Sequence, residues 1–196
     1  MIESREGQRE ALKRVAVALR RGGVKFALAG GYAVWAHGGP EPEHDVDVVV
    51  CPDDAEAAAV ALRDADLRVE QPPEDWLFKV YSDGAMVDVL LQINGRDVDT
   101  AMISRAYDIE VLSVVMPVSD ITDVLVGKMR ALNEQRCDLN KVLPSARAVR
   151  EQVDWERVAR EVAGHDLAVA CLYLLRRLGV APSGPEIDAA LHLPED

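Results

Sequence analysis

The chain has 196 residues, of which 49% are hydrophobic and 29% are charged, and its formal net charge is −12. This composition supports one compact domain, with or without a helical appendage, and no apolar run reaches the roughly 18 residues of a membrane span. The negative charge argues against broad adhesion to nucleic acid. Acidic residues concentrate in the middle of the chain, where residues 41–110 hold 18 acidic and 5 basic side chains.

The three cysteines, Cys51, Cys137 and Cys171, are odd in number and far apart. They match neither a disulfide framework nor a zinc spacing, and the first residues lack the apolar stretch of a secretory signal. We therefore expect a cytoplasmic protein with no membrane partner. We also expect all three cysteines to pack as small apolar side chains.

The first half of the chain alternates between helical and strand patterns. An apolar stripe with basic residues elsewhere predicts an amphipathic helix over residues 3–21. Pro52, Asp53 and Asp54 predict the cap of a later helix, because aspartate accepts hydrogen bonds from free amide groups at a helix N-terminus. The other expected elements are, in chain order, a strand at 25–29, a short helix at 32–37, a strand at 46–50, a helix at 55–64, an antiparallel hairpin of 76–81 with 85–93, and a strand at 111–115 closed by Pro117.

The second half reads as helical. Ser119 and Asp120 open a helix that runs to about residue 133, and Asp154 is expected to cap a later one. Further breaks are expected at Pro144, Gly164, Gly179 and residues 182–185. We therefore predict an α/β (α+β) fold with a small mixed sheet flanked by helices. Residues 1–118 form this core, including the N-terminal helix, and residues 119–196 form a C-terminal helical region that completes the active site.

Paired carboxylates within an apolar strand are the first sign of chemistry. Asp45 and Asp47 lie two positions apart in a valine-rich run, so their side chains point to the same face of the predicted strand. Two carboxylates this close repel each other unless a positive charge lies between them. Hard oxygen ligands suit Mg²⁺, so the pair predicts a divalent-cation site.

Asp88 repeats this anomaly, because it is a single carboxylate within the apolar run 85–91. A lone aspartate is unfavourable in a strand and costly if it is buried unpaired. If the two strands are neighbours, the three carboxylates form a two-metal site for Mg²⁺ or Mn²⁺. Asp88 would then complete one coordination shell and take the proton of the attacking hydroxyl.

Phosphate chemistry also needs a cradle for phosphate groups and further cations. Gly30 and Gly31 at a strand-to-helix junction supply a cradle, because backbone amides without side chains can approach an anion there. Lys128, on the first helix after the sheet, is the candidate cation, since charge builds on phosphate oxygens in the transition state. Lys79 in the hairpin is a second basic residue that could point into the site.

The ordered set of a strand, two glycines, a helix, Asp-x-Asp on a strand, Asp on a later strand and Lys on a helix resembles the DNA-polymerase-β-like nucleotidyltransferase superfamily. Within it, residues 28–38 look like the minimal branch that includes the AbiEii-type and MenT-type toxins of bacterial toxin–antitoxin systems. Residues 128–132, 136–139 and 153–155 are also similar to that branch. The resemblance covers roughly residues 24–160.

This resemblance implies a role for each matching residue. Asp45, Asp47 and Asp88 would be metal ligands and catalytic carboxylates. The phosphate-binding and site-completing residues would be Gly30, Gly31, Lys128, Arg136 and Asp138, with Lys128 on the triphosphate. Two departures stand out. Many relatives have serine at the position of Gly31, and many have threonine or serine at the position of His44. Tyr32 and Trp35 are candidates to line the nucleotide pocket, but core packing is the preferred interpretation for Trp35.

The resulting expectation is a metal-dependent enzyme that transfers an NMP group from an NTP to a hydroxyl group. Resemblance to the MenT-type branch implies the 3′ end of tRNA as acceptor and an antitoxin protein as partner. One alternative is transfer to a protein side chain or to a small antibiotic. Another is a non-catalytic nucleotide-binding or interaction module.

Overall fold

The computed structural model describes residues 5–42 and 45–191 and divides the chain into two compact units. The sheet unit comprises residues 1–36 and 41–120, and the helical unit comprises residues 37–40 and 121–196. His44 lies outside the described residues. Among the residues that are described, none of the helices is both long enough and apolar enough to cross a bilayer.

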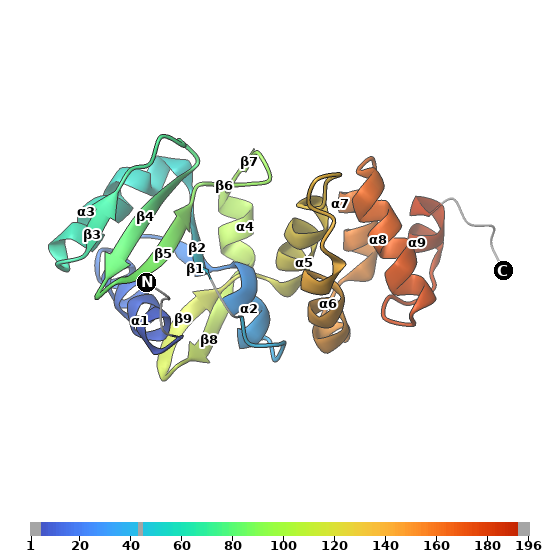
Figure 1. The fold of residues 1–196 in the computed structure, drawn as a ribbon, viewed down its shortest axis with the longest axis horizontal. Helices are drawn as coiled ribbons and strands as arrows, with labels where there is room; N and C mark the ends of the chain where they lie inside the picture. Colours follow the sequence, from blue (N-terminus) through green and yellow to red (C-terminus); the bar gives the residue numbers. More distant parts are fainter. Residues whose placement is uncertain (1–4, 43–44, 192–196) are drawn as a thin grey trace. The chain divides into compact units, whose positions relative to one another are not determined.

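Four α-helices and nine strands are described in the sheet unit, and Figure 1 labels them. They are α1 (Arg5–Arg21), β1 (Phe26–Leu28), α2 (Gly30–Ala36), β2 (Val46–Val50), the 3-10 turn η1 (Pro52–Asp54), α3 (Ala55–Asp64), β3 (Arg68–Glu70), β4 (Leu77–Ser82), β5 (Ala85–Leu90), β6 (Gln92–Ile93), β7 (Arg96–Asp97), α4 (Thr100–Arg105), β8 (Tyr107–Val111) and β9 (Val114–Val118). Within the described residues, seven strands form the main sheet in the order β3-β4-β5-β2-β1-β9-β8, and β6 pairs with β7 separately.

The main sheet is mixed, as the sequence predicts. β2 runs parallel to β5 and β1 runs parallel to β9, while the other neighbouring strands are antiparallel. The helices around it make this an α/β fold with a mixed sheet flanked by helices, which confirms the predicted fold class.

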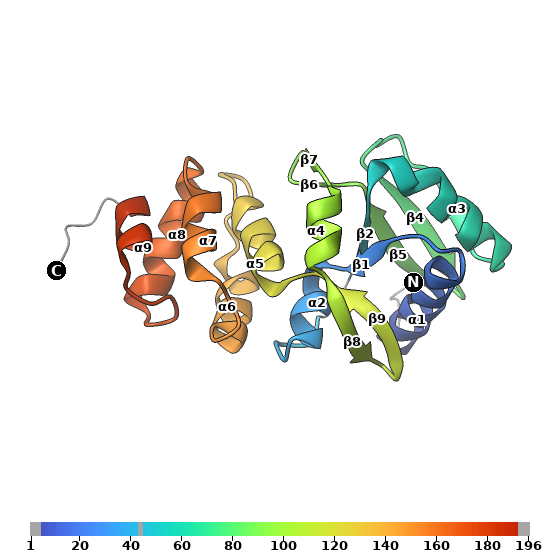
Figure 2. The same cartoon turned by 180° about the vertical axis from the view of Figure 1, so that it is seen from behind.

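The two faces of the sheet are covered differently. α1 packs against β4, β5 and α3, and Figure 2 shows α1 and α3 together. Arg14 of α1 donates to Ser82 Oγ, which places α1 on the face that holds the fully buried Val87 and Val89. On the opposite face, Met102 and Ile103 of α4 pack against a small core that includes Ala27, Ala29 and Val49. This second face carries the aspartates.

Two local expectations were wrong. The predicted strand at 111–115 spans a hairpin turn, because Leu112 and Ser113 both have positive φ, at 53° and 63°, and separate β8 from β9. Pro117 therefore lies inside β9 instead of closing a strand. α3 begins at Ala55 as predicted, but the Asp54 side chain makes no capping hydrogen bond to any described amide. Its backbone amide instead donates to Cys51 O and closes the turn η1.

The cysteines also differ from expectation. Cys51 and Cys171 are buried, and their burial raises the pKa of both thiols, that of Cys171 to about 11. Cys137 is exposed, so the expectation that all three would pack in the interior was wrong. It lies in the loop that joins Arg130 to Leu139.

The helical unit contains α5 (Ile121–Arg130), the 3-10 turn η2 (Leu139–Lys141), α6 (Leu143–Val149), α7 (Trp155–Val162), α8 (Asp166–Arg177) and α9 (Pro185–Ala190). α7 packs against α5, α8 and α9. Buried Trp155, Val158, Ala159 and Val162 form its apolar stripe, which explains why this short helix is central to the unit.

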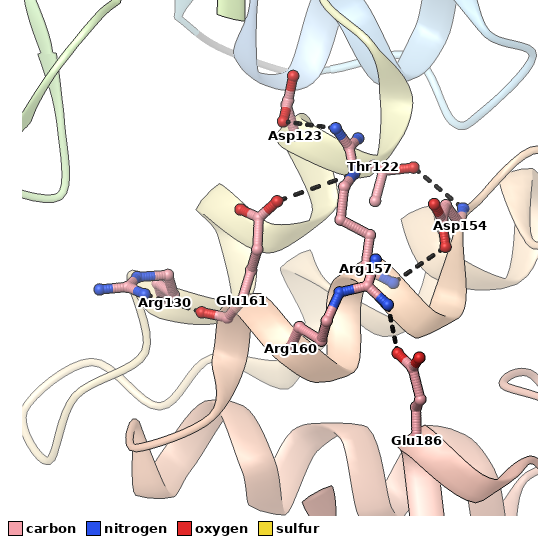
Figure 3. Close-up of polar contacts among 8 residues, drawn as sticks. All are labelled: Thr122, Asp123, Arg130, Asp154, Arg157, Arg160, Glu161 and Glu186. Atoms are coloured by element: carbon pink, nitrogen blue, oxygen red, sulfur yellow. Dashed lines mark hydrogen bonds and ion pairs between the residues drawn. The ribbon is translucent and has the colours of Figure 1, made fainter.

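A polar network joins α5 to α7 within this unit (Figure 3). Arg157 lies 3.3 Å from Asp123 of α5 and 3.8 Å from Glu161, one turn along α7. The Asp154 side chain accepts a hydrogen bond from the Arg157 amide at 2.9 Å, which confirms the predicted N-cap. Thr122 Oγ1 accepts from the Asp154 amide at 3.0 Å, so the start of α7 is fixed to the start of α5.

Replacing Asp123 with alanine should lower the free energy of unfolding by about 3 kcal/mol, because it leaves the Arg157 guanidinium without a nearly buried partner. Arg160→Ala is the matched control, since its ion pair with Glu186 is exposed and should contribute less than about 1 kcal/mol. Urea denaturation of the variants measures both. Equal losses of unfolding free energy in the two variants would contradict a larger stabilising contribution from the Asp123–Arg157 pair.

Candidate active site

Two carboxylates face each other across the parallel strands β2 and β5. Asp47 is the direct register partner of Asp88, so both side chains project from the same face of the sheet. Strand neighbours are about 4.8 Å apart in a sheet, so two negative charges are held close together by the backbone. Both side chains are half-buried, whereas the flanking Val46, Val48, Val87 and Val89 are buried on the other face.

Asp45 lies just before β2, two residues from Asp47, and is exposed. Its φ of 57° is in the left-handed region, which an aspartate tolerates better than most residues with a side chain. The backbone therefore turns at Asp45, immediately before the start of β2. The structure brings Asp47 and Asp88 together, and Asp45 is two residues from Asp47 in the chain.

Gly30 is in direct contact with the Asp47 carboxylate. It stands at the junction of β1 and α2 with a φ of 59°, and a Cβ atom built on it would lie 2.0 Å from Asp47 Oδ2. The neighbouring Ala29 amide donates to the Asp47 carbonyl oxygen at 2.8 Å, which fixes this junction to β2. A Cβ atom on Gly31 would lie 2.8 Å from Pro42 Cβ. Both glycines therefore allow a close approach that any other residue would block.

Lys79 on β4 adds a positive charge beside the two carboxylates. It is the register partner of Asp88 across β4 and β5, and its Nζ lies 2.9 Å from Asp88 Oδ1 and 3.4 Å from Met86 Sδ. Burial by itself would lower the pKa of the Lys79 ammonium, but the hydrogen bond and charge of Asp88 raise it above its ordinary value. The charge of Asp45 acts in the same direction.

The donor set fits a hard divalent cation in its chemistry. Asp45, Asp47 and Asp88 offer carboxylate oxygens, and Gly30 leaves the space that the Asp47 carboxylate needs. Within residues 5–42 and 45–191, however, no group of three or more histidine, cysteine or acidic side chains is already arranged to hold a metal ion. One oxygen of Asp88 accepts from Lys79 in this arrangement.

In the helical unit, a cavity of about 780 Å³ brings together three residues predicted from the sequence. Lys128 of α5, Arg136 and Asp138 line it, and so does Lys141 of η2, which the sequence analysis missed. The Asp138 side chain accepts a hydrogen bond from the Asn140 amide at 3.1 Å and so caps η2. Three cationic side chains around one cavity favour an anionic ligand.

The two aromatic candidates lie on α2 and differ in burial, since Trp35 is only half-buried. Tyr32 is fully buried, and its burial raises the pKa of its hydroxyl. Its ring meets that of Trp35 edge-on with centroids 5.9 Å apart, and the Arg9 guanidinium lies 5.5 Å from the Trp35 ring centroid. The burial of Tyr32 places it in the core rather than on a pocket wall. Trp35 packs against Tyr32 and Arg9 and stays half-buried.

Comparison with known proteins finds likeness at the level of the fold. No family model matches the chain, and no curated protein has a matching sequence. An antigenic nucleotidyltransferase-like protein from Paracoccidioides brasiliensis is 12% identical with a TM-score of 0.54, over 96% of this chain and 94% of that one. The antibiotic-resistance factor ANT(2'')-Ia is 12% identical with a TM-score of 0.53, over 90% of this chain and 95% of that one.

A second structure of ANT(2'')-Ia, in complex with adenylyl-2''-tobramycin, is 13% identical with a TM-score of 0.51, over 88% of this chain and 92% of that one. The chain thus shares the fold of nucleotidyltransferases along most of its length. The similarity extends over both units, since each alignment covers far more than the sheet unit alone.

Gly30→Ala should weaken Mn²⁺ binding by about tenfold, because the new Cβ displaces the Asp47 carboxylate and supporting residues typically affect metal affinity on this scale. Gly84→Ala is the matched control, since Gly84 also has a positive φ, of 86°, but a Cβ atom built on it would meet no heavy atom within 4 Å beyond its chain neighbours. Each variant should lose about 1 kcal/mol of stability from backbone strain. Calorimetric titration with Mn²⁺ would contradict this interpretation if both variants bound like the unmodified chain.

A thiol reagent should modify the native chain once, at Cys137 beside the helical-unit cavity. Cys51 and Cys171 should react only after denaturation, because they are buried and their raised pKa values disfavour the reactive thiolate. Mass spectrometry of the labelled peptides identifies the site. Rapid native labelling of Cys171 would contradict the described packing of α8.

Proposed function

We propose that this protein is a metal-dependent nucleotidyltransferase that moves an NMP group from an NTP to a hydroxyl acceptor. The observation that carries the proposal is the register of Asp47 with Asp88, with Gly30 against the Asp47 carboxylate. Paired carboxylates on one sheet face, beside a glycine turn, suit chemistry at a phosphate group. The shared fold with nucleotidyltransferases supports the same reaction class.

The proposed roles follow from the positions of the residues. Asp45, Asp47 and Asp88 would hold Mg²⁺ or Mn²⁺, which when bound supplies positive charge to the phosphate oxygens and a more acidic acceptor hydroxyl. Asp88 would accept the proton of that hydroxyl. The hydroxyl oxygen forms a bond to the α-phosphorus, the bond from the α-phosphorus to the bridging oxygen of the β-phosphate breaks, and pyrophosphate leaves.

Phosphate binding is proposed for two further groups of residues. Backbone amides of the turn at Gly30 and Gly31 would approach a phosphate group, since neither residue has a side chain to block it. Lys128 and Arg136, joined by Lys141 around the cavity of the helical unit, offer cations to phosphate oxygens. Asp138 would keep this loop in place by capping η2.

Our first candidate acceptor is the 3′ end of tRNA, which the resemblance to MenT-type toxins implies. Transfer there would block aminoacylation and arrest growth, and it would call for an antitoxin partner in the cytoplasm.

The charge pattern of α1 bears on the choice of acceptor, because most of its basic side chains have acidic partners. These pairs are Arg9 with Glu41, Lys13 with Glu10, Arg14 with Asp83, and Arg20 with Asp108.

This pairing favours a second candidate, a small hydroxyl-bearing antibiotic. A helix whose cations are already neutralised offers little attraction to a polyanionic RNA, and the net charge of −12 acts in the same direction. ANT(2'')-Ia, whose structure with adenylyl-2''-tobramycin has the same fold, fits such an acceptor. Transfer to a protein side chain remains a third outcome of the same test.

Incubation with each α-labelled NTP and Mg²⁺, in the presence of total tRNA, an aminoglycoside or cellular protein, should transfer label to one class of acceptor. Asp47→Asn and Asp88→Asn should lower the rate by about 10²- to 10⁴-fold, the range typical of lost proton-transfer and charge-stabilising groups. Asp53→Asn is the matched control, because Asp53 is an exposed acid in η1 just after β2. Full activity in Asp47→Asn would contradict catalysis at this site.

A further inference from the structure

Three charged side chains lie in a row across three neighbouring strands. Lys79 on β4 is opposite Asp88 on β5, and Asp88 is opposite Asp47 on β2. All three project from the sheet face opposite α1, because direct register partners share a face. The Lys79 ammonium is thus within hydrogen-bonding distance of an oxygen that the proposed cation site would use, at 2.9 Å from Asp88 Oδ1.

Lys79 relieves the repulsion that the register creates. Without a positive charge, Asp47 and Asp88 would hold two negative charges on adjacent strands, with Asp45 close in the chain. The Lys79 ammonium beside Asp88 offsets part of this negative charge. A divalent cation carries twice the charge of an ammonium, so a carboxylate attracts it more strongly at the same distance.

The Lys79–Asp88 ion pair is open enough to solvent for a cation to displace the ammonium. The Lys79 side chain is 29% exposed and that of Asp88 is 18% exposed, so the ammonium can leave toward water without being stranded in an apolar interior. Pairs that are partly open to solvent are weak compared with a coordinate bond to a divalent cation. Met86 Sδ, at 3.4 Å from Nζ, offers only a weak alternative acceptor.

We propose that Lys79 competes with a divalent cation for the Asp88 carboxylate and so sets the cation concentration at which the site loads. The inference rests on the nucleotidyltransferase site proposed above, but it concerns cation binding before any nucleotide is present. In this proposal Lys79 is a positioning residue, because it acts through its hydrogen bond to Asp88 and not on the substrate.

The test measures Mn²⁺ binding to the full, nucleotide-free chain by calorimetry and by the electron paramagnetic resonance signal of free Mn²⁺. Lys79→Gln should bind Mn²⁺ about three- to fivefold more tightly, the factor expected when a partly exposed ion pair no longer competes. Lys25→Gln is the matched control. It removes the same charge from an exposed position at the other end of β1, where salt screens its effect on Asp47.

Two further variants show whether the gain acts through Asp88. Asp88→Asn should weaken Mn²⁺ binding, and adding Lys79→Gln to it should produce no further gain, because the contested carboxylate is gone. Thermal melting gives an independent readout. Lys79→Gln should melt at a lower temperature than the unmodified chain without Mn²⁺ and should gain more from saturating Mn²⁺.

Unchanged affinity in Lys79→Gln would overturn the proposal, and so would an equal gain in Lys25→Gln or a gain that persists in the Asp88→Asn background. If no variant and no unmodified chain bound Mn²⁺, both this competition and the proposed cation site would be wrong. If the expected binding pattern were found without any NMP transfer, the competition would stand and the proposed function would fail.

Discussion

The close approach of Asp47 and Asp88 is the constraint on which the site depends. Parallel pairing of β2 with β5 holds two carboxylates side by side, and the backbone hydrogen bonds of the sheet do not allow them to separate. Their repulsion must be offset by positive charge. Lys79 supplies part of that charge from β4, and Gly30 gives the Asp47 carboxylate its room. The need for positive charge beside these carboxylates follows from strand register rather than from any single motif.

The surrounding sheet explains why charged groups are tolerated here. The face that holds Val87 and Val89 is sealed by α1, so apolar burial that stabilises the sheet is concentrated there. On the other face, α4 packs on the core around Val49 and its β1 partner Ala27. Val49 is two residues beyond Asp47 along β2. The carboxylates occupy the remaining, half-buried part of that face. Both faces of the same strands thus bury apolar side chains, but only the second face carries the half-buried pair Asp47 and Asp88.

Local sequence patterns correctly predicted the elements whose residues have strong intrinsic preferences for a strand or a helix. The valine run at 46–50 and the helix at 55–64 were placed correctly, because a β-branched run and an alanine-rich segment have strong intrinsic preferences. The strand at 111–115 was wrong, because an apolar run there conceals a turn at Leu112 and Ser113. The Lys79–Asp88 pair depends on register between β4 and β5, which long-range packing decides. For that reason the sequence suggested that Lys79 could point into the site but not which residue it would contact.

The central claim is that Asp47 belongs to a cation-dependent nucleotide site. Binding of a non-hydrolysable NTP analogue, measured by calorimetry with and without Mg²⁺, tests this most directly. The unmodified chain should bind the analogue far more tightly with Mg²⁺, and Asp47→Asn should lose that dependence while its melting temperature stays close to that of the unmodified chain. Equal, Mg²⁺-dependent binding by both proteins would contradict the claim.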